Sequence, residues 1–137
     1  MTIDSFQGPH RFLSNFWPAV VMLDGVEYPT VEHAYVAAKT LDPSARAQVA
    51  AIETPGAVKR FGRSLKLRED WDDVKLGIMS DLLRQKFTHP ELRAMLTATG
   101  TQELIEGNTW GDTFWGVCRG KGENHLGRIL MAVRAYA

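Results

Sequence analysis

The chain has 137 residues, of which 45% are hydrophobic and 23% charged, and this composition is typical of one folded domain and not of a disordered chain. Sixteen basic residues balance sixteen acidic ones, so no net charge draws the protein to nucleic acid or anionic lipid. Apolar runs such as Ala19 to Leu23 are far shorter than the roughly 20 residues that cross a membrane.

Two further features favour a cytoplasmic protein. The first ten residues, MTIDSFQGPH, lack a basic segment followed by an apolar one, so we expect no secretory signal. Cys118 is the only cysteine, so no disulfide can form within the chain, and we expect a reducing compartment.

The first part of the chain predicts a small β region followed by helices. Residues 20–29, VVMLDGVEYP, are typical of two short strands joined by a turn at Asp24-Gly25. Thr30 is a candidate N-cap for a short helix that reaches towards Leu41. Asp42-Pro43 begins a second helix in the same way, because proline is tolerated at the first helical position.

The clearest helical pattern is EDWDDVKLGIMSDLLRQKF at residues 69–87, where apolar side chains recur at helical spacing. PELRAMLTATG predicts a shorter helix that ends at Gly100, and NHLGRILMAVRAY predicts a final one. TQELIEG and FWGVC look extended. The order β, several helices, β, helix indicates a compact, mainly helical α+β domain that spans residues 1–137.

The first helix carries an acid and a base, Glu32 and Lys39, with Tyr35 and Val36 on the same side. Seven residues at ~1.5 Å rise place the two charged groups ~10 Å apart along the axis, near enough to approach one small ligand from two ends. A solvated polar face explains the same pattern, and His33 is typical of a structural or surface histidine. The expected core face consists of Val31, Ala34, Ala38 and Leu41.

A second cluster lies between Asn108 and Gly127, where two tryptophans stand among glycines, Asp112 and two asparagines. Trp110 or Trp115 could stack on a flat base while the polar groups bind a sugar or a phosphate. A tryptophan packed under a glycine-rich hairpin is the alternative. GKGENHLG lacks the spacing and the Ser or Thr of a phosphate-binding P-loop, so that motif is excluded.

A third stretch, PHRFLSNFWPA, sets Arg11, Ser14 and Asn15 among aromatic residues. The planar fork of Arg11 suits a phosphate, although an isolated arginine is usually a surface residue. One cysteine and four histidines show no paired spacing of the kind that binds a metal, so we expect no metal. We also expect no cofactor.

Five segments taken in order resemble the NADAR family, also called the YbiA-like N-glycosidases. These segments are FLSNFWPA, PTVEHAYVAAK, KFTHPELRAMLTATG, NTWGDTFWG and NHLGRILMAVR. The resemblance runs from about Phe6 to Arg134. It implies a compact, mainly helical α+β fold and hydrolysis of the N-glycosidic bond of ribose 5-phosphate or ADP-ribose derivatives.

The resemblance also implies roles for single residues. The EH-aromatic-QA-x-K pattern of the family falls on Glu32, His33, Tyr35 and Lys39, with Val36 in place of the glutamine. The D-x-x-WG and N-x-LG elements fall on Asp112, Trp115, Gly116, Asn124, Leu126 and Gly127. The implied catalytic residues are Glu32 as general acid and base, Lys39 as a nucleophile that forms a Schiff base, and Asp112, which would orient a ribose hydroxyl or assist the water. The implied substrate-binding residues are Arg11, Ser14, Asn15, His33, Tyr35, Trp115, Gly116 and Asn124.

Three functions stay open on this basis. The first is removal of ADP-ribose from guanine in nucleic acid. The zero net charge argues against long stretches of phosphate contact but allows recognition of one extruded base. The second is hydrolysis of a small phosphoribosyl intermediate of early riboflavin synthesis. The third is binding of ADP-ribose or an NAD-like ligand without catalysis, which does not require a lysine of altered pKa.

Overall fold

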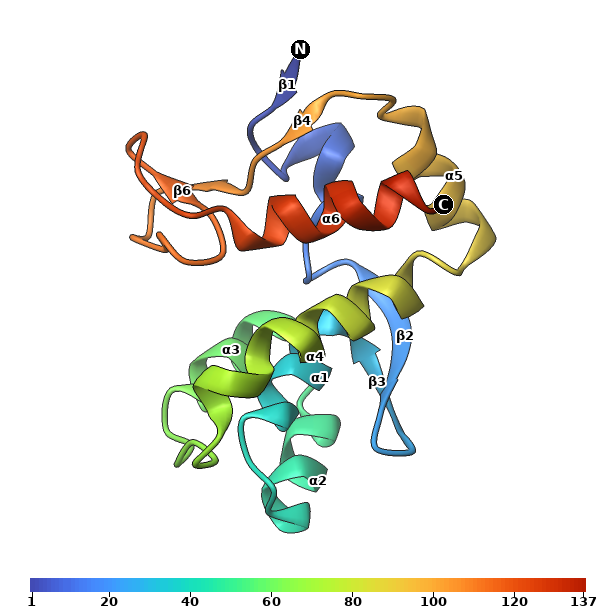
Figure 1. The fold of residues 1–137 in the computed structure, drawn as a ribbon. Coiled ribbons are helices and arrows are strands. Elements are labelled where there is room, and N and C mark those ends of the chain that lie inside the picture. Colours follow the sequence, from blue (N-terminus) through green and yellow to red (C-terminus); the bar gives the residue numbers. More distant parts are fainter. The chain divides into compact units, whose positions relative to one another are not determined.

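The computed structural model describes all 137 residues and contains seven helices and six short strands. This mainly helical content confirms the predicted α+β class. The chain forms two compact units, drawn in Figure 1. The central unit comprises Asn15–Lys86, and the terminal unit comprises Met1–Ser14 with Phe87–Ala137. A single domain over residues 1–137 stays a prediction.

The central unit opens with the predicted hairpin. Strands β2 (Pro18–Leu23) and β3 (Val26–Thr30) pair antiparallel, with Leu23 opposite Val26. Asp24 and Gly25 form the two-residue turn with φ of 49° and 80°. Positive φ at both positions is what the favoured hairpin turn requires, and Asp-Gly meets it at low cost.

Four helices complete the central unit: α1 (Val31–Ala38), α2 (Pro43–Ala51), α3 (Pro55–Gly62) and α4 (Trp71–Lys86). The side chains of Thr30, Asp42 and Thr54 cap the first three by accepting a backbone N–H. The predicted helices that correspond to α1, α2 and α4 are confirmed. Helix α3 is absent from the predicted elements, although Thr54-Pro55 carries the same signal for a helix start as Asp42-Pro43.

Helix α1 packs against both strands of the hairpin and the three other helices of the unit (Figure 1). Val31, Ala34 and Ala38 are buried as predicted, but the opposite side is buried too, because neighbours cover the helix all round. The predicted division of α1 into a core face and a solvated face is therefore wrong. Leu41 is 62% exposed because α1 ends before it, so its predicted place in the core is also wrong.

The terminal unit contains the 3₁₀-helix η1 (Gly8–Leu13), α5 (Pro90–Ala98) and α6 (His125–Ala135). Its parallel strand pairs are β1 (Thr2–Ile3) with β4 (Glu103–Leu104), and β5 (Gly107–Asn108) with β6 (Val117–Cys118). The extended segments β4 to β6 and both α-helices are confirmed. Gly100 follows α5 with a φ of 66°, as the predicted end requires.

Residues from both ends of the sequence share the core of the terminal unit. The buried apolar side chains are Ile3, Phe6, Phe12, Leu13, Phe87, Leu92, Leu96, Leu104, Leu126 and Leu130. The first strand and η1 are not predicted from the sequence, because two- and six-residue elements give too few positions for a periodic pattern. None of the helices combines the length and the apolar character that a membrane span requires.

Candidate functional site

Helix α1 is fixed at its N-terminus by a histidine whose two ring nitrogens are both engaged. His33 is fully buried, and its Nε2 lies 2.9 Å from the Ile52 carbonyl oxygen while its Nδ1 lies 2.7 Å from the Thr30 hydroxyl. A carbonyl only accepts, so Nε2 carries the proton and Nδ1 accepts from Thr30. The Thr30 oxygen in turn accepts the His33 backbone N–H. His33 therefore positions α1 through bonds inside the protein.

The first turn of α1 presents Glu32 beside Asn15. The backbone N–H of Glu32 donates to the Asn15 carbonyl over 3.1 Å, which ties the segment before the hairpin to the helix start. The Asn15 amide nitrogen lies 3.6 Å from the sulfur of Met79, whereas its buried Oδ1 has no hydrogen-bond partner. A buried acceptor without a donor is costly, so this oxygen is an unsatisfied polar group of the central unit.

The other end of α1 carries Lys39, which is half-buried. Its amine lies 5.7 Å from the centre of the Tyr35 ring, and this ring packs on Trp71 with centroids 5.1 Å apart. A cation over an aromatic face is stabilised by the ring's quadrupole. The aromatic pair thus gives the amine an oriented and largely apolar surface.

Helix α3 closes the space on another side of Lys39. A Cβ added to Gly62 would lie 3.6 Å from Lys39 Nζ and 3.1 Å from a methyl of Val36. Val36, which stands at the family's glutamine position, is fully buried. The departure from the family pattern therefore places an apolar side chain beneath the amine and adds to its desolvation.

These surroundings shift the proton equilibrium of Lys39. Burial lowers the pKa of Lys39 below its ordinary value of 10.5, because a low-dielectric environment disfavours the ammonium form. The negative charge of Glu32 opposes this shift, and the positive charges of Lys59 and Arg63 add to it. The structure therefore brings the predicted acid and base, Glu32 and Lys39, into electrostatic contact. It adds two cationic residues that the sequence does not indicate, Lys59 of α3 and Arg63, which directly follows that helix.

The backbone around Lys39 is held from two directions. Its carbonyl accepts the Arg68 backbone N–H over 2.7 Å. Arg46 Nε donates to the carbonyls of Ala37 and Thr40 on either side, over 3.1 and 2.8 Å. The Arg46 guanidinium also pairs with Asp24 at the hairpin turn over 2.7 Å. Helix ends normally leave carbonyls without donors, and here other segments supply those donors.

In the terminal unit, Asp112 organises the loop after β5. Its Oδ1 accepts the backbone N–H groups of Phe114 and Trp115 over 3.1 and 2.9 Å. The Asn108 side chain bonds both the N–H and the carbonyl of Asp112, over 3.0 and 2.8 Å. The Oδ2 of Asp112 takes part in none of these bonds, so Asp112 supports the loop through one carboxylate oxygen.

The two tryptophans of this loop differ in exposure. Trp115 is half-buried and meets the Phe114 ring edge-on at 4.9 Å, with the His125 ring at 6.4 Å. Trp110 is 55% exposed, so the alternative of a core tryptophan is wrong for this residue. Neither indole is simply a core residue.

Asn124, Gly116 and Gly127 shape the backbone of the terminal unit. Asn124 has a φ of 53° and bonds the Glu106 N–H and the Leu104 carbonyl over 3.0 and 2.9 Å. A Cβ on Gly127 would overlap the Leu104 carbonyl oxygen, and one on Gly116 would overlap the Glu106 carbonyl oxygen. The N-x-LG pattern thus marks a close approach of α6 to the strand at Leu104.

Arg11 and Ser14 belong to the terminal unit, around the end of η1. Arg11 is exposed and donates to the Gln7 side chain over 3.3 Å, and the Ser14 N–H donates to the Arg11 carbonyl over 2.9 Å. Asn15 belongs to the central unit. No three His, Cys, Asp or Glu side chains gather where they could hold a metal ion.

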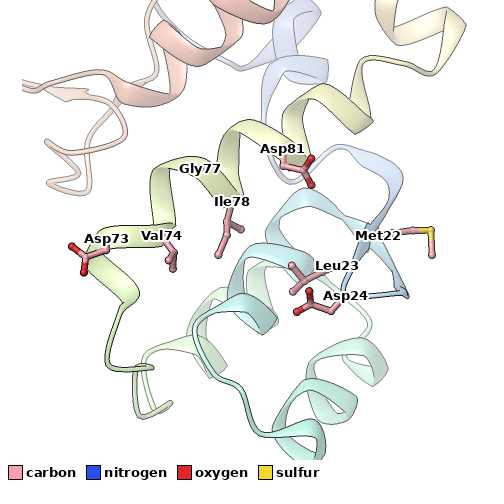
Figure 2. Close-up of a pocket in the computed structure, with 8 residues that line it drawn as sticks. All are labelled: Met22, Leu23, Asp24, Asp73, Val74, Gly77, Ile78 and Asp81. Atoms are coloured by element: carbon pink, nitrogen blue, oxygen red, sulfur yellow. The ribbon is translucent and has the colours of Figure 1, made fainter.

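The pocket drawn in Figure 2 lies away from Glu32 and Lys39. Its volume is about 430 Å³, and Figure 2 shows side chains of the hairpin and of α4 around it. They are Met22, Leu23, Asp24, Asp73, Val74, Gly77, Ile78 and Asp81. Asp24 is paired with Arg46, and Gln85 bonds Asp81 and both backbone groups of Met22. These contacts pin the hairpin to α4, so we assign this pocket a structural role.

Comparison with known proteins shows the family and the fold of the chain. Residues 4–136 match the family model described as the NADAR domain. The chain is 42% identical over 127 residues to N-glycosidase YbiA of Escherichia coli, covering 88% of this chain and 78% of that protein. The solved NMR structure of E. coli YbiA superposes with a TM-score of 0.85 at 38% identity, covering 99% of this chain and 83% of the other.

Two further relatives carry different names. N-glycosidase Npun_R5314 of Nostoc punctiforme is 39% identical, and the match covers 92% of this chain and 85% of that protein. Riboflavin biosynthesis protein VVA0006 of Vibrio vulnificus is 38% identical, over 91% of this chain but only 35% of that protein. The same domain therefore also occurs inside a longer protein.

Proposed function

The chain belongs to the NADAR family and is an N-glycosidase, a hydrolase of N-glycosyl bonds, and from this premise we propose that it removes ADP-ribose from guanine in nucleic acid. The observation that carries the reaction is the environment of Lys39. A half-buried amine of lowered pKa, electrostatically coupled to Glu32, supplies a nucleophile and an acid within one unit.

The proposed reaction begins with transfer of a proton from Lys39 to Glu32. The neutral amine then attacks the anomeric carbon of the ribose, and the bond from that carbon to the guanine nitrogen breaks. Glu32 returns the proton to the departing base. The attached nitrogen then passes a proton to the ring oxygen as the bond from that oxygen to the anomeric carbon breaks, which leaves an open-chain sugar joined to Lys39 as a protonated Schiff base. Addition of water releases the sugar as an aldehyde and restores the Lys39 amine.

Asn15 and Tyr35 are proposed to bind the sugar in the same unit. The buried Oδ1 of Asn15 suits a ribose hydroxyl because it has no donor within the protein. The Tyr35 ring lies beside Lys39, where it shields the covalent intermediate from premature attack by water. The roles of Asp112 and Trp115 in substrate binding stay predictions from the family resemblance.

The second candidate substrate is an early intermediate of riboflavin synthesis. The observation that favours it is the name of the Vibrio vulnificus relative, riboflavin biosynthesis protein. The chemistry at Lys39 is the same for both candidates, because each breaks a bond between the anomeric carbon of a ribose and a nitrogen.

One experiment separates these possibilities. The protein is incubated with an oligonucleotide carrying ADP-ribosyl-guanine, or with a phosphoribosylamino pyrimidine, and sodium borohydride is added to reduce any Schiff base. Mass spectrometry should find the sugar adduct on Lys39 for the true substrate, and Lys39→Ala should abolish both adduct and turnover. Lys66→Ala, an exposed lysine, is the control. Turnover that survives in Lys39→Ala would eliminate the covalent mechanism, and binding without release would indicate a ligand-binding protein.

A further inference from the structure

We infer that Lys59 of helix α3 and Arg63, the residue that caps its C-terminus, form the subsite for the phosphoryl group on O5 of the ribose attacked by Lys39. This inference rests on the proposed function. Both candidate substrates carry a phosphoryl group at this oxygen, as a pyrophosphate in ADP-ribose and as a monoester in a phosphoribosyl intermediate. The shared chemistry is therefore a phosphate adjoining the reacting sugar.

Helix α3 approaches Lys39 at Gly62, between two cationic residues. Lys59 and Arg63 are four residues apart, so they lie on the same side of the helix, and Gly62 lies between them in sequence. Gly62 has no side chain, which allows its backbone to approach Lys39 Nζ closely. The two cations therefore flank the point where α3 meets the nucleophile.

Lys59 also lies near the segment that contains Asn15, the residue proposed to bind the sugar. The Lys59 amine lies 6.0 Å from the centre of the Phe16 ring, next in sequence to Asn15. Asn15 contributes the buried oxygen without a donor. A ribose that bonds Asn15 and presents its anomeric carbon to Lys39 would have its phosphate near the cations of α3.

The electrostatics agree with an anion at this position. Lys59 and Arg63 each act on Lys39 strongly enough to lower its pKa, so three positive groups share one region. Arg63 is exposed and forms no ion pair with a carboxylate. Like charges held together repel one another, and a bound phosphate would relieve that repulsion.

Stabilisation of the helix dipole is another reason for basic residues at the end of α3. Lys59 and Arg60 both lie in the last turn, where a cation is favourable. Arg60 shares that benefit but points to a different side of the helix, and its charge is not among the causes of the Lys39 pKa shift. Arg60 is therefore a matched control for charge and helix position.

The kinetic test compares Lys59→Gln, Arg63→Gln and the double variant with Arg60→Gln. We expect each subsite variant to raise KM about tenfold for a phosphorylated substrate, since a charge-assisted bond contributes roughly 1.5 kcal/mol or more. Arg60→Gln and the charge-preserving Lys59→Arg should leave KM within about twofold. The KM of the same substrate without its phosphate should not change in any of these variants, whereas its kcat should respond to Lys59→Gln and Arg63→Gln because both cations act on the pKa of Lys39. An equal rise in KM in Arg60→Gln, or for the dephosphorylated substrate, would overturn the assignment.

A binding test separates this inference from the proposed function. Ribose 5-phosphate and ribose are titrated into the full-length protein and followed by NMR or calorimetry. Preferential binding of ribose 5-phosphate that disappears in the Lys59→Gln, Arg63→Gln protein supports the subsite even if neither candidate substrate is hydrolysed. No preference for the phosphorylated sugar would overturn the subsite even if hydrolysis is observed.

Discussion

Lys39 Nζ lies 5.7 Å from the centre of the Tyr35 ring, so the proposed nucleophile rests on the face of an aromatic side chain of its own helix. The four-residue spacing that makes this contact is a local property of α1. The other groups around the amine, Val36, Gly62, Glu32 and the cations of α3, decide its proton affinity.

The reactivity of Lys39 should depend on pH with a midpoint below 10.5, because burial lowers the pKa of its amine. Labelling with an amine-reactive reagent, read by mass spectrometry at several pH values, gives this midpoint, and Lys66 serves as an internal reference. Glu32→Gln removes the charge that opposes the shift, so the midpoint should fall further. A midpoint at the ordinary value, unaffected by Glu32→Gln, would show that the amine is not desolvated.

Gly62→Ala should impair both stability and turnover. The new methyl would lie 3.1 Å from Val36 and 3.6 Å from Lys39 Nζ, and crowding of this kind costs about 1–3 kcal/mol. Urea unfolding measures the first effect, and steady-state kinetics measures the second. Gly56→Ala on the same helix has open space around it and should be neutral or slightly stabilising. If the two variants behave alike, α3 does not approach Lys39 as described.

Asn124 should be required for the stability of the terminal unit. Asn124→Ala removes hydrogen bonds to the Leu104 carbonyl and the Glu106 N–H and places alanine at a φ of 53°. We expect a loss of about 2–4 kcal/mol. Asn124→Gly loses the same bonds without the backbone strain and should be less damaging by about 1 kcal/mol. Denaturant midpoints for the two variants test the order, and the reverse order would contradict the left-handed conformation.

Lys86 should make stability depend on pH above neutrality. It is fully buried at the end of α4, and burial lowers the pKa of its amine to about 7. Between pH 7 and 10 the unfolded chain binds this proton and the folded chain does not, so stability should rise with pH. Lys86→Met should remove this contribution, which is worth about 1.4 kcal/mol per pH unit.

Unfolding of wild type and Lys86→Met at pH 7 and pH 9 gives the comparison. The difference between the two proteins should grow in favour of wild type at the higher pH. Lys66→Met, at an exposed lysine, controls for removal of a charge. Parallel pH profiles for wild type and Lys86→Met would mean that the buried amine titrates at its ordinary value.

The sequence predicts those elements whose signals are local. The hairpin follows from Asp24-Gly25 between short apolar runs, and α4 follows from apolar residues at a period near 3.6. The burial of α1 on all sides cannot be predicted from its own residues, because alanine is common in buried and in exposed helices alike. The sequence therefore predicts too narrow a core face for α1. It also predicts a buried Leu41, although this residue lies beyond the end of the helix.

Prediction of the candidate site is limited in the same way, to residues with a local signal in the sequence. Glu32 and Lys39 are recognisable because one helix carries both at a suggestive spacing. Lys59 and Arg63 lie on an element that the periodicity does not reveal, and only the fold brings them beside Lys39. The Thr54-Pro55 start of α3 was the one local signal that could have pointed to them.

The hydrogen bonds that Arg46 donates to the backbone on either side of Lys39 limit how the nucleophile can move. The Ala37 and Thr40 carbonyls accept from one guanidinium, and the Lys39 carbonyl accepts from the Arg68 backbone N–H, so these bonds restrain the main chain at the proposed nucleophile. Movement of the amine between free enzyme, covalent intermediate and released product should then come mainly from the four torsions of its own side chain.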